Sequence, residues 1–155
     1  MTTTVLVADD QALIRAGFSA IIDSAPDLRV VGQAATGLEA VRLARDLLPD
    51  VVLMDIRMPD LDGIAATEEI TSDERLSAVR VVVLTTFEVE ELVLAALRAG
   101  ASGFLGKDVG PTGLLDAIRT VASGEALLSP RATRGLIDRY LATRSEEHTS
   151  ELQSH

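Results

Sequence analysis

Five short apolar runs alternate with amphipathic helical patterns along the chain. The third and fourth runs are continuously apolar, which is typical of parallel strands buried on both faces. Alternation of such strands with helices favours a parallel sheet with helices packed on its faces. We therefore expect an α/β fold with a five-stranded, doubly wound parallel sheet. Its predicted strands are residues 4–9, 29–34, 50–55, 80–85 and 102–106.

The segments between these runs carry start and stop signals of helices. Apolar residues recur at helical spacing over 14–22 in the first segment. Thr36 and Glu39 form a capping box at the start of the second. Gly100 suits a left-handed exit from the fourth, and Pro111 suits the first turn of the fifth. Each segment between strands therefore predicts one helix, and a fifth helix follows the last strand.

Polar side chains follow four of the predicted strands at the point where each strand ends. Asp9 ends the first strand and Asp10 follows it, Asp55 ends the third, Thr85 ends the fourth and Lys107 follows the fifth. In a doubly wound sheet, ligands bind outside the carboxyl ends of the strands. Three carboxylates, one hydroxyl and one ammonium at that edge predict a site for a divalent cation and a phosphoryl group.

The acidic residues each have a simpler structural explanation as well. An aspartate before a helix, such as Asp9 or Asp10, is often an N-cap, and Asp55 could be an ordinary turn residue. Two adjacent carboxylates at a buried strand end repel each other, however, and Mg²⁺ relieves that repulsion. A carboxylate held rigidly at the end of a buried strand also suits an oxygen nucleophile toward phosphorus. We therefore favour Asp55 as the nucleophile.

The remaining candidates are equally open to two interpretations. Thr85 could donate a hydrogen bond to a phosphoryl oxygen, whereas Thr86 could simply cap the next helix. Lys107 could be an ordinary surface lysine, but beside several carboxylates it would form a salt bridge at rest. Phe104, considered by itself, is most simply explained as an ordinary core residue.

Composition excludes several classes of function. With 24 acidic and 14 basic residues, the chain has a formal net charge of -10 and is a poor partner for DNA phosphates. It has no cysteine, and its two histidines are His148 and His155. A disulfide and a cysteine-ligated zinc are therefore excluded, and within residues 1–147 so are a Ser-His-Asp triad and a histidine-ligated metal. The N-terminus lacks a signal-peptide pattern, and no apolar run approaches the roughly 20 residues that span a bilayer, so we expect a cytoplasmic protein without membrane contact.

Taken in order, the strand-end residues match a known family. Together with Met58-Pro59 and Asp62-Gly63, they resemble the receiver domain of bacterial two-component response regulators over about residues 3–124. The resemblance implies a flavodoxin-like fold with strand order 2-1-3-4-5. Finer features are similar to the NarL/FixJ (LuxR-type) subfamily, and they lie at residues 84–87, 99–105, 107–108 and 127–130.

The resemblance also implies a metal site and a phosphodonor. Asp55 would accept a phosphoryl group from a histidine kinase. Asp10 and Asp55 would bind Mg²⁺ directly, the backbone carbonyl of Arg57 would be a third protein ligand, and Asp9 would act largely through water. Such a domain is not an enzyme in the usual sense, because at most it catalyses its own phosphorylation and dephosphorylation.

A conformational switch follows from the same resemblance. Thr85 and Lys107 would hold the phosphoryl oxygens, and Phe104 would turn inward when Thr85 moves. The family often has proline after its lysine, whereas this chain has Asp108. That departure leaves the role of Lys107 intact and argues against a cis peptide bond there.

The expected domain organisation has three parts. Residues 1–124 form the receiver domain, and 125–143 form a linker with a short helix around 136–141. Residues 144–155 are polar and lack periodicity, so we expect a disordered tail derived from a vector or another reading frame. Such regulators usually continue into a helix-turn-helix domain that this sequence does not contain. DNA binding is therefore expected only through that missing domain, and phosphorylation is expected to favour a homodimer.

Two other functions fit the same predicted fold. A flavin- or nucleotide-binding module would need phosphate-cradling glycines, but the glycines at 100, 103 and 106 fit neither common phosphate-loop pattern. A hydrolase with an aspartyl nucleophile, of the haloacid dehalogenase type, would need an acidic residue two positions after Asp55. That position is Arg57.

Overall fold

The structure is a computed structural model that describes residues 2–86, 90–125 and 127–128. The predicted linker helix around 136–141 and the predicted disordered tail at 144–155 lie outside the described residues.

All strands of the sheet are parallel, and their order is β2-β1-β3-β4-β5-β6. This order confirms the prediction of a 2-1-3-4-5 flavodoxin-like sheet. A sixth strand, β6, adds to the predicted five, because the backbone of two residues in the expected connector pairs with Gly103 and Phe104 and covers the edge of β5. The strands are β1 Thr3–Ala8, β2 Leu28–Ala34, β3 Val51–Asp55, β4 Arg80–Thr85, β5 Gly103–Gly106 and β6 Leu127–Leu128.

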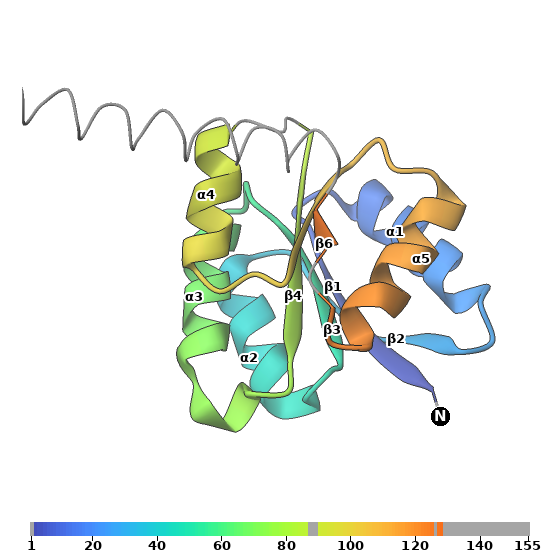
Figure 1. Ribbon diagram of the computed structural model, residues 1–155, viewed down its shortest axis with the longest axis horizontal. Coiled ribbons are helices and arrows are strands. Elements are labelled where there is room, and N and C mark those ends of the chain that lie inside the picture. The colour runs from blue at the N-terminus through green and yellow to red at the C-terminus, as the bar shows by residue number, and fades with distance from the viewer. Residues whose placement is uncertain (1, 87–89, 126, 129–155) are drawn as a thin grey trace, which may run out of the picture.

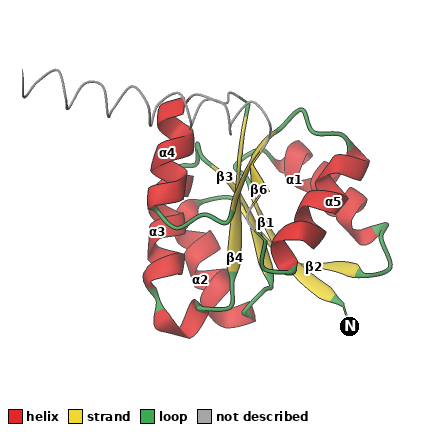
Figure 2. Cartoon of the chain, in the orientation of Figure 1, coloured by secondary structure: helices red, strands yellow, loops and turns green. Residues whose placement is uncertain are grey.

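Helices cover both faces of this sheet, as Figures 1 and 2 show. Helices α1 and α5 lie on one face, and α2, α3 and α4 lie on the other. A short 3₁₀ helix, Glu74–Leu76, precedes β4 and adds to the predicted elements. The α-helices are α1 Ala12–Asp23, α2 Gly37–Leu47, α3 Gly63–Ser72, α4 Glu90–Arg98 and α5 Pro111–Ala122.

The central strands bury side chains on both faces, which explains their continuously apolar sequence. In β1, Leu6 packs into one core cluster, whereas Val5 and Val7 pack into the other. In β3, Val52 and Leu53 divide in the same way. Each strand alternates between two hydrophobic cores, so β1 and β3 are rigid supports for the residues that follow them.

Two predicted helix signals are present in the structure. The hydroxyl of Thr36 accepts a hydrogen bond from the backbone N–H of Glu39 at 3.1 Å, and the Glu39 carboxylate accepts one from Ala35 N–H. Gly100, two residues after the end of α4, has a φ of 97°, and the following N–H, from Ala101, bonds to the carbonyl of Ala96. Capping and the left-handed exit therefore define these helix ends as the sequence predicts.

Candidate functional site

Three carboxylates converge at the carboxyl edge of the sheet. Asp9 follows β1 and Asp55 ends β3, and these two strands are neighbours. One carboxylate oxygen from each of Asp9, Asp10 and Asp55 lies within 4.8 Å of the others. The topology therefore brings residues more than 40 positions apart into one acidic cluster, as the strand ends predict.

Lys107 joins this cluster from the loop after β5. Its Nζ lies 2.8 Å from Oδ2 of Asp9 and 3.1 Å from Oδ1 of Asp55, and its side chain is only 11% exposed. Its backbone N–H donates to the carbonyl of Thr85 at 2.7 Å, which ties the loop to the end of β4. The expected salt bridge at rest is thus present, and it reaches two carboxylates at once. The structure has no cis peptide bond among its described residues, so the bond after Lys107 is trans.

Asp9 belongs to the cluster and also bonds to the backbone of the chain just before α1. Its Oδ1 accepts a hydrogen bond from the backbone N–H of Gln11 at 2.8 Å, at the start of α1. Its Oδ2 faces Lys107 and is buried, and it accepts no hydrogen bond of good geometry within the described part of the chain. The N-cap of α1 is Gln11, which makes no side-chain capping bond, so the interpretation of Asp9 or Asp10 as the N-cap is wrong and both residues lie before the helix.

Burial dominates the electrostatics of Asp55, whose side chain is almost fully enclosed. This burial raises the pKa of Asp55 above its ordinary value, the bond from Lys107 lowers it, and the charges of Asp9 and Asp10 raise it further. Burial alone would lower the pKa of Lys107, but its bonds to Asp9 and Asp55 raise that pKa above the ordinary value. The Lys107 ammonium therefore stays charged, and burial disfavours the charged form of the Asp55 carboxylate opposite it.

We expect Asp55→Asn to stabilise the metal-free protein at neutral pH. Because the folded-state pKa of Asp55 is raised, its charged form is disfavoured on folding, and this penalty is full only above the raised pKa. The variant should raise the Tm by about 2–4 °C, or roughly 1 kcal/mol in a chain of this size. Thermal unfolding in EDTA provides the measurement.

The gain should disappear as the pH falls below the ordinary value for aspartate, since the carboxyl is then protonated in both the folded and the unfolded chain. A lower Tm for the variant at neutral pH would show that the Lys107 ion pair outweighs the burial of Asp55.

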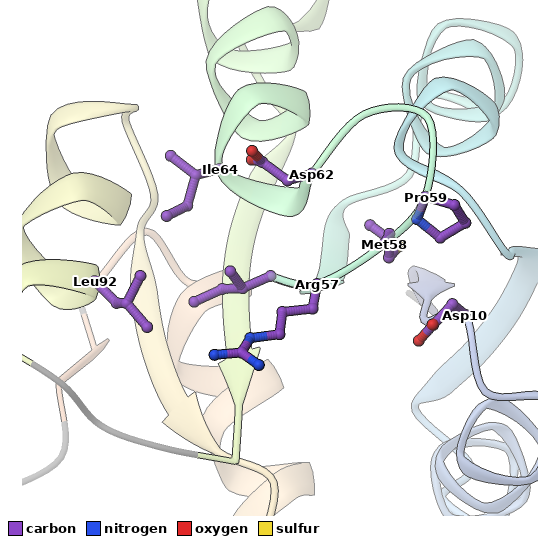
Figure 3. Close-up of a pocket in the computed structure, with 8 residues that line it drawn as sticks. Asp10, Arg57, Met58, Pro59, Asp62, Ile64 and Leu92 are labelled. Carbon is purple, nitrogen blue, oxygen red and sulfur yellow. The ribbon is translucent and has the colours of Figure 1, made fainter.

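Two cavities that share lining residues open beside the cluster. A cavity of about 260 Å³ contains the phosphoacceptor candidate, and its lining residues are Asp10, Gln11, Asp55, Arg57, Thr85, Thr86 and Lys107. A second cavity of about 590 Å³ shares Asp10 and Arg57 with the first and extends past Ile64 to Leu92 on α4. Figure 3 shows the Arg57 side chain lying across this second cavity between Leu92 and Asp10. A ligand bound at Asp55 therefore has an open approach.

The loop after Asp55 depends on a glycine whose role the sequence analysis missed. The N–H of Gly63 donates to the carbonyl of Ile56 at 2.7 Å, and a Cβ at Gly63 would lie 1.9 Å from the Asp55 carbonyl oxygen. Asp60 in the same loop has a φ of 69°. The signal was in the sequence as Met58-Pro59 followed by Asp62-Gly63, but it predicts a turn and a helix start rather than this close contact.

The remaining predicted switch residues lie on adjacent strands. Thr85 is buried at the end of β4, and Phe104 is fully buried in β5 beside Val83. Phe104 packs in the core cluster that faces α4. The structure therefore already has Phe104 in an inward position.

The donor set fits a hard divalent cation. Mg²⁺ prefers carboxylate and carbonyl oxygens together with water, and it rarely uses more than one or two carboxylates. The cluster offers an exposed carboxylate on Asp10, a buried one on Asp55, and an Oδ2 on Asp9 without a well-formed hydrogen bond. These residues fit the metal that the sequence analysis predicts.

Comparison with known proteins agrees with this geometry. The family model for the response regulator receiver domain matches residues 5–119. The chain belongs to the response regulator receiver family. The uncharacterised transcriptional regulatory protein YxjL of Bacillus subtilis is 41% identical over 96% of this chain and 67% of its own length. The nitrate/nitrite response regulator NarL of Escherichia coli is 38% identical over 84% of this chain and 59% of its own length.

Solved structures place the chain in the same family. A LuxR-family response regulator from Aurantimonas is 32% identical, with a TM-score of 0.83 over 91% of this chain and 99% of its own. The receiver domain of a putative NarL from Mycobacterium tuberculosis is 35% identical, with a TM-score of 0.77 over 80% of this chain and 98% of its own. This chain is thus a receiver domain of the NarL type, and none of these relatives supports a flavin- or nucleotide-binding alternative. No helix among the described residues is long and apolar enough to span a membrane.

Proposed function

We propose that this receiver domain accepts a phosphoryl group on Asp55 from the phosphohistidine of a histidine kinase. The observation that carries the proposal is the Asp55 carboxylate at the end of a buried strand, 3.1 Å from the Lys107 ammonium and within 4.8 Å of two further carboxylates. Membership of the receiver family supports the same role.

In the transfer step, an Asp55 carboxylate oxygen forms a bond to phosphorus as the bond from phosphorus to the donor's imidazole nitrogen breaks. The imidazole keeps the bonding electron pair and takes up a proton from water. The Lys107 ammonium can turn from the carboxylates to the phosphoryl oxygens, and the Thr85 hydroxyl can donate to them. The residues thus act by positioning and by charge stabilisation, with little proton chemistry of their own.

The Mg²⁺ site proposed here uses the carboxylates of Asp10 and Asp55 and the backbone carbonyl of Arg57, with Asp9 acting through water. When bound, Mg²⁺ neutralises charge on the incoming phosphoryl group. Burial raises the pKa of Asp55, and the charges of Asp9 and Asp10 raise it further, so a bound cation would favour the charged carboxylates. Cation binding and phosphoryl transfer therefore depend on the same cluster.

The output proposed for this domain is a change in pairing between regulators. A phosphoryl group adds about -1.5 to -2 charges next to Thr85. Movement of Thr85 toward the phosphoryl group would favour the inward position of Phe104 that this structure shows. It would also repack the face formed by α4 and β5. We propose that this change favours a homodimer. Beryllofluoride, a phosphoryl mimic, should shift the protein to dimer in size-exclusion chromatography, and an unchanged elution volume would contradict it.

The role of the whole regulator follows from its relatives. The chain spans 59–67% of the length of two curated relatives that are named as a transcriptional regulatory protein and a response regulator. We propose that residues 1–124 are the receiver, that 125–143 are the linker, and that DNA binding belongs to a further domain. The kinase domain that donates the phosphoryl group and the promoter both lie in the cytoplasm in such a system, and we place this protein there as well.

The proposed function is tested by measuring phosphate uptake with a small acyl phosphate as donor. In Mg²⁺ the intact protein should gain the mass of one phosphoryl group, and in EDTA it should gain none. Uptake that is equal with and without Mg²⁺ would contradict the proposed metal site, and no uptake under any condition would contradict the phosphoacceptor role.

A further inference from the structure

Arg15 reaches from helix α1 back to the loop that carries the acidic cluster. Its Nη1 donates to the backbone carbonyl of Asp9 at 2.7 Å, in a partly buried environment. This is the only side-chain hydrogen bond to that carbonyl among the described residues. Hydrogen bonds from a charged donor are shorter and stronger than neutral ones, so the contact is a firm constraint on the loop.

The contact completes the set of bonds that hold Asp9. Its N–H donates to the carbonyl of Ala34, its Oδ1 accepts from Gln11, and its Oδ2 pairs with Lys107. The Asp9 carbonyl belongs to the peptide group that joins Asp9 to Asp10. The orientation of that peptide plane therefore depends on Arg15.

The position of the Asp10 side chain depends on this peptide group. Its side chain is exposed, and its carboxylate forms no hydrogen bond or ion pair with another described residue. Even so, one of its carboxylate oxygens lies within 4.8 Å of those of Asp9 and Asp55. Repulsion from these two charges would turn a free Asp10 side chain toward solvent, so its place in the cluster depends on the backbone that presents it.

We propose that Arg15 is a positioning residue for the divalent-cation site. By holding the peptide plane between Asp9 and Asp10, it keeps the Asp10 carboxylate directed at the position where Mg²⁺ binds. The inference rests on the proposed function, because it requires that Mg²⁺ binds at this cluster. Partners that orient the ligands of a metal commonly contribute about 10- to 100-fold to metal affinity.

The sign of the effect separates positioning from simple electrostatics. Arg15 is a cation close to a cation site, so by Coulomb's law alone its removal should strengthen Mg²⁺ binding. Loss of a positioning contact should weaken the binding instead. The two effects have opposite signs, and one affinity measurement therefore distinguishes them.

The experiment measures Mg²⁺ affinity by calorimetry in the unphosphorylated protein, at a temperature where circular dichroism shows each variant to be folded. Arg15→Met removes the donor and keeps most of the apolar length of the side chain, and Arg15→Lys keeps the charge and one donor group. Arg29→Met is the matched control, because Arg29 is exposed at the opposite end of the neighbouring strand β2, where it pairs with Thr4.

We expect Arg15→Met to weaken Mg²⁺ binding about 10-fold. Arg15→Lys should recover part of this loss, and Arg29→Met should bind like the parent. Unchanged or tighter binding by Arg15→Met would overturn the inference, and so would an equal loss in Arg29→Met. If the parent itself bound no Mg²⁺, the proposed function would fail first, so the two failures are distinguishable.

Discussion

Asp55→Asn is expected to reduce phosphate uptake by at least about 100-fold. The substitution preserves the size of the side chain, but it replaces the proposed nucleophile, a carboxylate oxygen, with an amide that attacks phosphorus poorly, and it removes one proposed ligand of the cation. Loss of an interaction made only in the transition state commonly costs about two to three orders of magnitude in rate. Intact-protein mass spectrometry with an acyl phosphate donor and Mg²⁺ provides the measurement.

Asp60→Asn is the matched control for this experiment. Asp60 lies in the loop that follows Asp55, its side chain is exposed, and its φ of 69° is a conformation that asparagine tolerates well. The control removes one nearby negative charge without touching the cluster and should take up phosphate like the parent. Uptake by Asp55→Asn at the parental level would show that another residue is the acceptor.

Lys107→Met is expected to weaken both the fold and the reaction. The ammonium is the only cationic group within 4 Å of the buried carboxylates of Asp9 and Asp55 among the described residues. Its removal leaves two buried negative charges unpaired, and breaking a buried ion pair in this way typically costs about 3–5 kcal/mol. We expect a decrease of about 2–4 kcal/mol in the free energy of unfolding in EDTA, since the side chain retains some exposure. Urea denaturation in EDTA measures this free energy of unfolding.

Mg²⁺ provides the internal control for Lys107→Met. A bound cation neutralises the same carboxylates, so Mg²⁺ should stabilise the variant by more than it stabilises the parent. Phosphate uptake should nevertheless stay at least about 100-fold below the parent even in saturating Mg²⁺, because the phosphoryl oxygens lose a charged partner. A variant as stable as the parent in EDTA, or one with normal uptake, would contradict the role assigned to this lysine.

The double variant Asp9→Asn/Lys107→Met tests how much the unpaired charge of Asp9 costs once Lys107 is gone. Asp9 is the more deeply buried of the two partners, and neutralising it removes one of the two unpaired charges. We expect the double variant to be more stable in EDTA than Lys107→Met alone. If it is less stable, the hydrogen bond that the Asp9 carboxylate accepts from Gln11 contributes more than the unpaired charge of Asp9 costs.

The sheet was predictable because its strands and their polar ends are local patterns. The order of the strands came from the family resemblance, and the structure confirms it. Strand β6 could not be anticipated, since a two-residue pairing leaves no periodicity in the sequence and depends on where α5 returns the chain. The linker and tail remain predictions, because they lie outside the described residues.

Membership of the acidic cluster was predictable for a different reason. Parallel strands bring their carboxyl ends to one edge, so Asp9, Asp55 and Lys107 could be placed together without any knowledge of side-chain conformation. Contacts that involve backbone groups could not be predicted from the sequence in this way. The close packing of Gly63 against the Asp55 carbonyl and the bond from Arg15 to the Asp9 carbonyl depend on how two loops fold over the sheet edge.

Locating the phosphoryl group on the chain tests the central claim most directly. Borohydride reduces an acyl phosphate on aspartate to homoserine, and the position of that homoserine can be read by peptide mass spectrometry. After phosphorylation in Mg²⁺, we predict homoserine at position 55, at the end of strand β3. Homoserine at another aspartate, or a stable phosphoester on Thr85, would contradict Asp55 as the phosphoryl acceptor.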